Sequence, residues 1–408
     1  MRTRTPSRPA ASDPKRAALS EALAGELGRV RDAGLLRVLR EIDGAQEPVV
    51  QLAGRDVLLL CSNNYLGLAN HPEVVEAARE ASARYGASAA SSRLVSGHMR
   101  AHRAFEEHLA QWKSLEAALA FSTGYHANVG VITALTGRDD LVVSDELNHA
   151  SIIDGARLSR ASVAVVRHND SAHLEQVLRG ASRYRRVLVV TESVFSMDGD
   201  RAPLDEIVEL AQRYGAWTMV DEAHGAGVFG RSGAGVADEL GLSEHIDVHV
   251  GTLGKALASF GAYVAGSRRL VDWLVNAARP FIFTTGLPPS AVAAADAAVS
   301  ICEREPERAG GLRRRVAALA RRLRDAGLEV PHSDSQILPV WIGGAERTMA
   351  TMHALLERGV YVAGIRPPTV PPGTSRLRLS VMATHNDAQL EQAAKAIVES
   401  VEATRELG

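Results

Sequence analysis

Lysine, cysteine and long apolar segments are scarce in this sequence. Only four of its 46 basic residues are lysines, namely Lys15, Lys113, Lys255 and Lys395. The two cysteines, Cys61 and Cys302, form neither a disulfide framework nor a metal-ligand pattern, so we expect buried thiols in a reducing cytoplasm. No apolar run approaches the roughly 20 residues of a membrane-spanning helix, so we expect no membrane partner.

An excess of charge of one sign is also lacking. The net charge is −2 over 408 residues, and 46% hydrophobic with 23% charged residues is typical of a globular protein. This composition does not indicate nucleic acid or a membrane surface as a partner. Residues 1–18 are rich in Arg, Pro and Ser and have no apolar segment of the kind that a secretory signal contains. We expect a disordered N-terminal extension there.

Short apolar segments alternate with helical patterns through the middle of the chain. The strand-like segments are 117–121, 141–144, 163–166, 187–191, 218–221, 248–251 and 262–265. Strands of this kind, separated by helices, predict an α/β fold with a mostly parallel central sheet covered by helices. Ligand sites in such folds lie beyond the carboxyl ends of the strands.

Composition divides the chain into segments. Residues 19–60 have a helical pattern, which extends over 17–42, followed by strand patterns. The alternating region then predicts a large domain over 61–288. Pro288 and Pro289 interrupt it, and a smaller α+β domain is expected over 289–408. That domain should begin with one long helical stretch as far as Arg324 and contain a strand near 361–365.

Lys255 stands out in Val250–Ala256 (VGTLGKA) because the chain uses arginine almost everywhere else. A lysine amine can lose its proton and form a Schiff base, whereas a guanidinium cannot. The alternative interpretation is a surface lysine with no special role.

Three further motifs follow predicted strands. Phe121–Asn128 reads as a strand, a Ser-Thr-Gly turn and a helix start, which suits a phosphate, although a plain Ser/Thr N-cap has the same pattern. His149 begins a helix and is either a capping side chain or a ring that lies on a planar cofactor. Asp221 ends a strand three residues before His224, where it can pair with a protonated ring nitrogen, cap a turn or bind Mg²⁺.

The order of these groups favours one cofactor. An anion cradle, a stacking ring, a carboxylate and an amine are the groups that pyridoxal 5'-phosphate (PLP) requires. A nucleotide-binding enzyme is disfavoured, because no Gly-x-Gly-x-x-Gly opens a helix after a strand.

These motifs resemble the α-oxoamine synthase family of PLP enzymes over about residues 20–405. The resemblance implies a PLP-dependent transferase of fold type I. It implies that Lys255 binds the cofactor aldehyde, Asp221 the ring nitrogen and His224 the 3-oxygen, while His149 stacks on the ring. All four would be catalytic. The remaining cofactor contacts that it implies are Gly124, Tyr125, Ser196, Thr252 and, from a partner chain, Thr284 or Thr285.

The resemblance also implies substrate contacts and an activity. Arg37 and Thr369 match acyl contacts, Asn63 a substrate-side asparagine, and Arg378 the arginine that binds the amino-acid carboxylate. The expected reaction is a decarboxylative condensation of an amino acid with an acyl thioester, in a homodimer with shared active sites. Within the family, Gly364–Leu379 (GIRPPTVPPGTSRLRL) is most similar to members of biotin biosynthesis that use L-alanine and a pimeloyl thioester, carried by coenzyme A or a carrier protein.

Two alternatives remain open. The chain resembles glycine- or serine-using members as well, and in Leu147–Leu158 and Gly251–Leu257 nothing discriminates between them. A catalytically silent subunit of the same fold is the second alternative, against which the intact lysine, aspartate and histidines argue.

Overall fold

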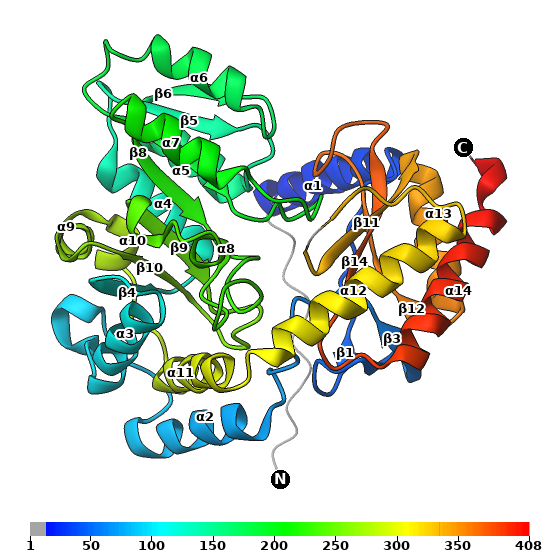
Figure 1. Ribbon diagram of the computed structural model, residues 1–408. Coiled ribbons are helices and arrows are strands. Elements are labelled where there is room, and N and C mark those ends of the chain that lie inside the picture. Colours follow the sequence, from blue (N-terminus) through cyan, green and yellow to red (C-terminus); the bar gives the residue numbers. More distant parts are fainter. Residues whose placement is uncertain (1–13, 334, 408) are drawn as a thin grey trace.

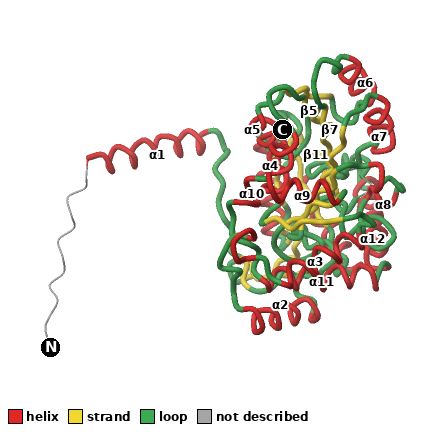
Figure 2. Tube along the Cα trace, turned by 90° about the vertical axis from the view of Figure 1, so that its left-hand side faces the viewer, coloured by secondary structure: helices red, strands yellow, loops and turns green. Residues whose placement is uncertain are grey.

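The computed structural model describes residues 14–333 and 335–407. Most of the expected N-terminal extension therefore lies outside the described residues. The first helix, α1 (Pro14–Asp32), begins inside the range expected for that extension and ends before the expected residue 42. It ends there because Gly34 adopts a left-handed φ of 68° and the Leu35 N–H returns to the Val30 carbonyl at 2.9 Å. Figure 2 shows α1 standing away from the rest of the described chain.

A seven-stranded sheet forms the centre of the larger half (Figure 1). Its strands, in spatial order, are β4 (Ala117–Phe121), β10 (Ala262–Gly266), β9 (Val248–Thr252), β8 (Trp217–Asp221), β7 (Val187–Glu192), β5 (Leu141–Asp145) and β6 (Ser162–Val166). Only β10 runs antiparallel to its neighbours. The expected mostly parallel sheet is confirmed.

Both faces of this sheet are buried, which explains the continuous apolar runs. Val142 and Val143, neighbours on β5, belong to different apolar clusters because successive side chains point to opposite faces. One face packs on α4 (Gly124–Leu135), α5 (Ala150–Ser159), α9 (Arg268–Ala277) and α10 (Arg279–Ile282). The other packs on α3 (Arg100–Trp112), α6 (Ser171–Arg179), α7 (Leu204–Arg213) and α8 (Val236–Glu239). A π-turn (Arg93–Gly97) and a 3-10 turn (Ser243–His245) complete this part.

A smaller sheet forms the core of the C-terminal part. It is antiparallel, in the order β11 (Ile337–Gly343), β14 (Ser375–Ser380) and β13 (Ala363–Ile365). The helices of this part are α12 (Glu307–Asp325), α13 (Ala345–Glu357) and α14 (Asp387–Ala403), followed by a 3-10 turn (Arg405–Leu407). This is the expected smaller C-terminal domain.

A third sheet joins the two ends of the chain. Its order is β1 (Ile42–Asp43), β2 (Val49–Leu52), β3 (Arg55–Leu59) and β12 (Val360–Tyr361), and β3 pairs with β12 in parallel. The single strand expected at 361–365 is therefore two strands, β12 and β13, in different sheets. The N-terminal strands thus belong, by pairing, with the C-terminal part.

The helical stretch expected from residue 289 to 324 is also divided. Helix α11 (Pro289–Arg304) ends before Pro306, and α12 follows it, because proline cannot donate the backbone hydrogen bond that a continuous helix requires. Helix α11 packs against α2 (Pro72–Tyr85) and α3, whereas α12 packs against α14 and β11. We therefore propose that the domain boundary lies near Pro306 rather than at 289.

Candidate active site

The site lies beyond the carboxyl ends of the large sheet's strands. Asp221 is the last residue of β8, Glu192 the last of β7 and Thr252 the last of β9, with Lys255 three residues further on. Because these strands are parallel neighbours, their ends meet at one edge. The structure therefore brings Lys255, Asp221 and His224 together, as the sequence predicts.

Lys255 lies against His224. The Lys255 Nζ is 2.7 Å from His224 Nε2, and the lysine side chain is partly buried. Loss of solvent lowers the pKa of Lys255 to about 8, with Arg378 adding to the decrease and the carboxylates of Asp221 and Glu192 opposing it. Burial, and then the positive charge of Lys255, holds the pKa of His224 well below 6.5. The amine therefore faces a neutral imidazole.

A continuous chain of polar contacts links this lysine to the C-terminal domain. His224 Nδ1 lies 2.7 Å from the Tyr65 hydroxyl, and Arg378 on β14 places Nη2 3.4 Å from the same hydroxyl. Arg378 Nη1 lies 3.4 Å from Asn63 Oδ1 and 2.9 Å from Ser380 Oγ, and its Nε donates to the Ser196 carbonyl. An amine and a guanidinium thus meet in one site from two domains.

The strand-end carboxylate of Asp221 is held by two donors. Its Oδ1 accepts from the Ala223 N–H at 2.8 Å, and its Oδ2 accepts from Asn128 Nδ2 at 2.7 Å. Asn128 lies on α4 and is buried. The side chain of Asp221 is therefore fixed before any ligand binds.

His149 is the N-cap of α5 and lies beside the strand-end carboxyl groups of Asp221 and Glu192. Its Nδ1 accepts from the Ser151 N–H at 3.2 Å and lies 2.8 Å from Ser151 Oγ, while much of the ring remains exposed. Its backbone N–H donates to Glu192 Oε1 at 2.7 Å. Burial, and then the charge of Asp221, raises the pKa of Glu192 to about 8. The predicted capping and ring-presenting roles of His149 are compatible.

The start of α4 forms an open helix N-terminus at the same edge. Thr123 is the N-cap and accepts from the His126 N–H at 3.0 Å, and a Cβ added to Gly124 would meet no atom within 4 Å. Tyr125 is exposed and donates to Asp154. The Thr252 hydroxyl donates to the Gly261 carbonyl at 3.2 Å and accepts from the Gly254 N–H at 3.2 Å, so it shapes the loop before Lys255.

Three predicted residues stand apart from this cluster. Arg37 and Thr369 are exposed, but Arg366 Nη2 donates to the Leu36 carbonyl at 3.1 Å, so their two segments lie side by side. Thr285 is exposed and pairs with Ser92 in an isolated β-bridge. No hydrogen bond among the described residues joins these three side chains to Lys255.

Four residues of the site were not selected from the sequence: Tyr65, Asn128, Glu192 and Ser151. Asn128 lies within the Phe121–Asn128 motif and Ser151 within Leu147–Leu158, while Tyr65 lies two residues after Asn63 and Glu192 directly after the predicted strand 187–191. A polar residue within or directly after a predicted buried segment, as Asn128 and Glu192 are, was the available signal.

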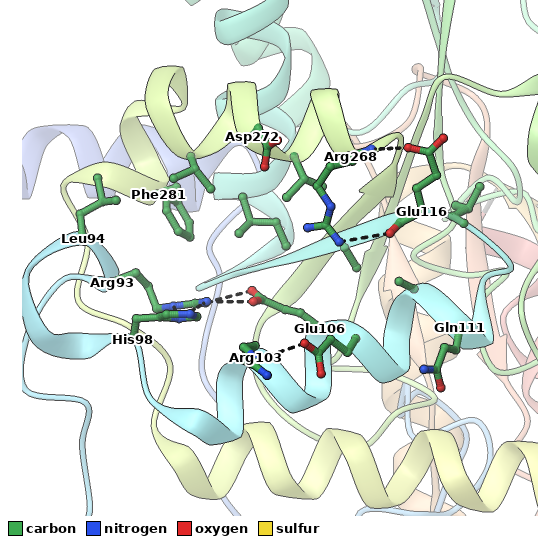
Figure 3. A pocket seen from close by; sticks show the side chains of 17 residues that line it. Arg93, Leu94, His98, Arg103, Glu106, Gln111, Glu116, Arg268, Asp272 and Phe281 are labelled. Carbon is green, nitrogen blue, oxygen red and sulfur yellow. Dashed lines mark hydrogen bonds and ion pairs between the residues drawn. The ribbon is translucent and has the colours of Figure 1, made fainter.

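Two well-formed cavities lie elsewhere. One of about 530 Å³ is lined by Arg93, Glu106, Arg268 and Phe281 among others (Figure 3), and one of about 730 Å³ includes Trp217 and Trp273. In the first, Arg93 forms a bidentate pair with Glu106 at 2.9 and 3.0 Å, so its central charges are already neutralised. Neither cavity contains an amine and a carboxyl group with pKa values shifted as those of Lys255 and Glu192 are. We therefore take the Lys255 cluster as the site.

Comparison with known proteins gives consistent results. The family model for aminotransferase class I and II matches residues 55–397. The chain is 52% identical over 383 residues to an 8-amino-7-oxononanoate synthase of Geobacter sulfurreducens, covering 93% of this chain and 97% of the relative. A serine palmitoyltransferase structure with a PLP internal aldimine superposes with a TM-score of 0.90 at 34% identity, covering 95% and 98% of the two chains. An 8-amino-7-oxononanoate synthase of Francisella tularensis superposes with a TM-score of 0.74 at 26% identity, covering 85% and 98%.

Proposed function

Since this chain belongs to the aminotransferase class I and II family, and within it to the α-oxoamine synthases, we propose that it makes 8-amino-7-oxononanoate for biotin biosynthesis. The substrates are L-alanine and a pimeloyl thioester, and the other products are CO₂ and a free thiol. The observation that carries this proposal is the contact chain from Lys255 through His224 and Tyr65 to Arg378. It places an amine that can act on the α-carbon beside a guanidinium that can bind the α-carboxylate.

The cofactor is PLP, and the residues present fit it. Lys255 offers an amine of lowered pKa for the aldehyde, and Asp221 offers a carboxylate whose protein partners are both donors. The open N-terminus of α4 suits a phosphate, with Gly124, Tyr125 and Thr252 around it. His149 would cover the ring, His224 would face the 3-oxygen, and Ser196 would line the site. When bound, PLP withdraws electrons from the substrate α-carbon.

The side chains then divide the remaining work. Arg378 binds and orients the alanine carboxylate, for which its 3.4 Å contacts to Asn63 and Tyr65 are long enough to be replaced. The Lys255 amine removes the α-proton as general base, because a pKa of about 8 leaves a useful neutral fraction near that pH. His224, 2.7 Å away, keeps that amine directed into the site.

The acyl substrate would enter near Arg37 and Thr369, which the Arg366–Leu36 contact brings to the same side. We propose a homodimer in which the partner's copy of Thr285 completes the phosphate site. Exposed apolar side chains support this arrangement, namely Leu94, Val95, Tyr125, Phe260 and Phe283. Helix α1, which stands away from its own chain in Figure 2, also exposes Leu19, Leu23 and Leu27.

No helix in the described part of the chain has both the length and the apolar character needed to cross a bilayer. We propose a cytoplasmic location on a separate ground, since Cys61 and Cys302 are unpaired thiols.

One observation favours a second candidate function, the condensation of serine with a palmitoyl thioester. The superposition on serine palmitoyltransferase is better than that on the Francisella synthase, although the sequence relatives at about 50% identity are 8-amino-7-oxononanoate synthases. The purified protein should therefore be assayed with alanine, glycine and serine against acetyl, pimeloyl and palmitoyl thioesters of CoA and of carrier protein, with product mass as the readout.

Alanine with a pimeloyl thioester should give the product, and the preferred carrier follows from the same panel. A higher kcat/KM for serine with a palmitoyl thioester would overturn the proposal in favour of the second candidate. A protein that stays colourless with added PLP would indicate a silent subunit.

A further inference from the structure

Asn128 occupies a position between two residues of the site. Its Nδ2 lies 2.7 Å from Asp221 Oδ2 and 2.9 Å from Ser151 Oγ, so its two amide hydrogens are both used. Its Oδ1 is buried and has no hydrogen-bond partner among the described residues. An unmade hydrogen bond of this kind costs about 1–3 kcal/mol. The opposite amide orientation would place Oδ1 against the Asp221 carboxylate, so the donors fix the orientation.

The hydrogen bonds continue from Ser151 to His149 in one direction. Because the Ser151 oxygen accepts from Asn128, its own proton is free to be donated to His149 Nδ1, 2.8 Å away. The Ser151 N–H also donates to that nitrogen at 3.2 Å. Nδ1 is therefore an acceptor on a neutral ring, and the ring proton is on Nε2.

Building on the proposed function, we infer that Asn128 is a positioning residue that acts on both sides of the cofactor site. It holds Asp221 as an oriented, ionised carboxylate and, through Ser151, holds His149 in one orientation with its proton on Nε2. One amide thus fixes the group that would pair with the ring nitrogen and the ring that would cover it.

The surroundings of Asp221 make its charge depend on this amide. Glu192 is the register partner of Asp221 on the adjacent strand, so two carboxyl groups lie close together in a buried place. Two such groups do not both ionise easily. Asp221 receives donors on both oxygens, whereas among the described residues the side chain of Glu192 accepts a single backbone N–H, at Oε1. The two donors favour a carboxylate at Asp221, and the pKa of its neighbour Glu192 is raised by burial and then by Asp221.

The sharpest test replaces Asn128 with a side chain of the same shape. Asn128→Asp places a carboxyl group where the amide NH₂ donor faces Asp221, so the two carboxyl groups share a proton and the charge of Asp221 is weakened. We expect kcat to fall by about 100-fold and the PLP Kd to rise by about 10-fold, with the alanine KM within about threefold of wild type. Asn128→Ala, which introduces no carboxyl, should change both values in the same direction but less.

Ser151→Ala separates the effect of Asn128 on His149 from its effect on Asp221. It leaves the Asn128–Asp221 contact intact but removes the hydroxyl that donates to His149 and that accepts the second Asn128 amide hydrogen. The PLP Kd should stay near the wild-type value, while ¹⁵N NMR of the histidine rings should show a loss of the uniform Nε2–H form of His149. Val131→Ala is the matched control, because Val131 is a fully buried residue of α4 in the apolar cluster under the sheet. It should lower the Tm without changing the PLP Kd.

Different results would overturn the inference about Asn128 and the proposed function. Wild-type PLP Kd and kcat in a folded Asn128→Asp protein would overturn the inference. So would equal losses in Val131→Ala, since the effect would then follow stability alone. If Asn128→Asp fails to fold, an unchanged PLP Kd in Asn128→Ala overturns the inference. A wild-type protein that does not bind PLP would overturn the proposed function, and the inference with it.

Discussion

The Nζ of Lys113 lies 2.5 Å from Glu222 Oε2, and neither side chain has any exposed area. Lys113 is the C-cap residue that follows α3 and also donates to the Ala234 carbonyl, and Glu222 Oε1 accepts from the Ala237 N–H at 2.9 Å. Glu222 directly follows Asp221. The pair therefore fixes the loop that carries His224.

Lys113→Met should destabilise the protein strongly. Removing one partner of a buried pair leaves an uncompensated charge and costs about 3–5 kcal/mol, whereas replacing both with apolar groups is often neutral. Urea unfolding should show a large loss for Lys113→Met and recovery of most of it in Lys113→Met/Glu222→Leu. A double variant that is as unstable as the single one would contradict this account of the pair.

Lys255→Ala should abolish covalent attachment of PLP and all turnover. Borohydride reduction of the wild-type protein should leave the cofactor on the peptide that contains Lys255, detectable by mass spectrometry. Lys395 offers a control, because its side chain is 79% exposed on α14, and Lys395→Ala should keep both the label and the activity. A label that remains in Lys255→Ala would place the attachment on another residue.

Arg378→Ala should raise the KM for alanine by about 10- to 100-fold, because a hydrogen bond to a charged group is worth about 1.5–3 kcal/mol. The KM for the pimeloyl thioester should change by less than about threefold, since that substrate does not use this guanidinium. Steady-state kinetics with each substrate varied in turn gives both values. Equal increases in the two constants would show that Arg378 does not bind the amino-acid carboxylate.

Much of the fold could be predicted, because buried strands consist of apolar residues and are therefore visible in the local composition. The expected strand at 187–191 corresponds to β7, and that at 218–221 to β8, since a strand covered on both faces must be apolar throughout. The division of 360–365 between β12 and β13 could not be predicted. Its pattern is continuous, and only the partners, β3 for one and β14 for the other, separate the two strands.

The same limit applies to the site. Lys255, Asp221 and His224 follow predicted strands, and their chemistry made them recognisable. Asn128 and Tyr65 act through contacts to residues far along the chain, which depend on how α4 and the loop after β3 pack on the sheet. Such contacts between distant residues cannot be predicted from the local sequence pattern.

Stability should decrease at high pH through His108. Its hydrogen bond to Asp296, and then that to Glu303, raise its pKa to about 9 against the cost of desolvation. A raised folded-state pKa means that the stabilisation is complete below about pH 6.5 and is lost as the pH rises through about 9. Because both carboxylates are substantially exposed, we expect only about 1 kcal/mol.

The measurement for His108 is the free energy of unfolding at pH 6 and pH 9.5. His108→Gln should lower stability at pH 6 and leave it nearly unchanged at pH 9.5, which reduces the pH dependence. His173 caps no such carboxylate pair, so His173→Gln should follow the wild-type pH dependence. Parallel curves for His108→Gln and wild type would exclude this contribution.

The parallel pairing of β3 with β12 also imposes a delay on the newly made chain. Strand β3 can pair with β2 early, but Leu58 and Leu59 acquire their partners on the other side, Val360 and Tyr361, only about 300 residues later. At about 5–20 residues per second, that is about 15–60 s on the ribosome. During this interval the apolar cluster of β2 and β3 lacks the part of its native cover that Leu356 and Tyr361 provide. The earliest strands of the chain are therefore among the last to be fully sheltered, and a chaperone has that period in which to hold them.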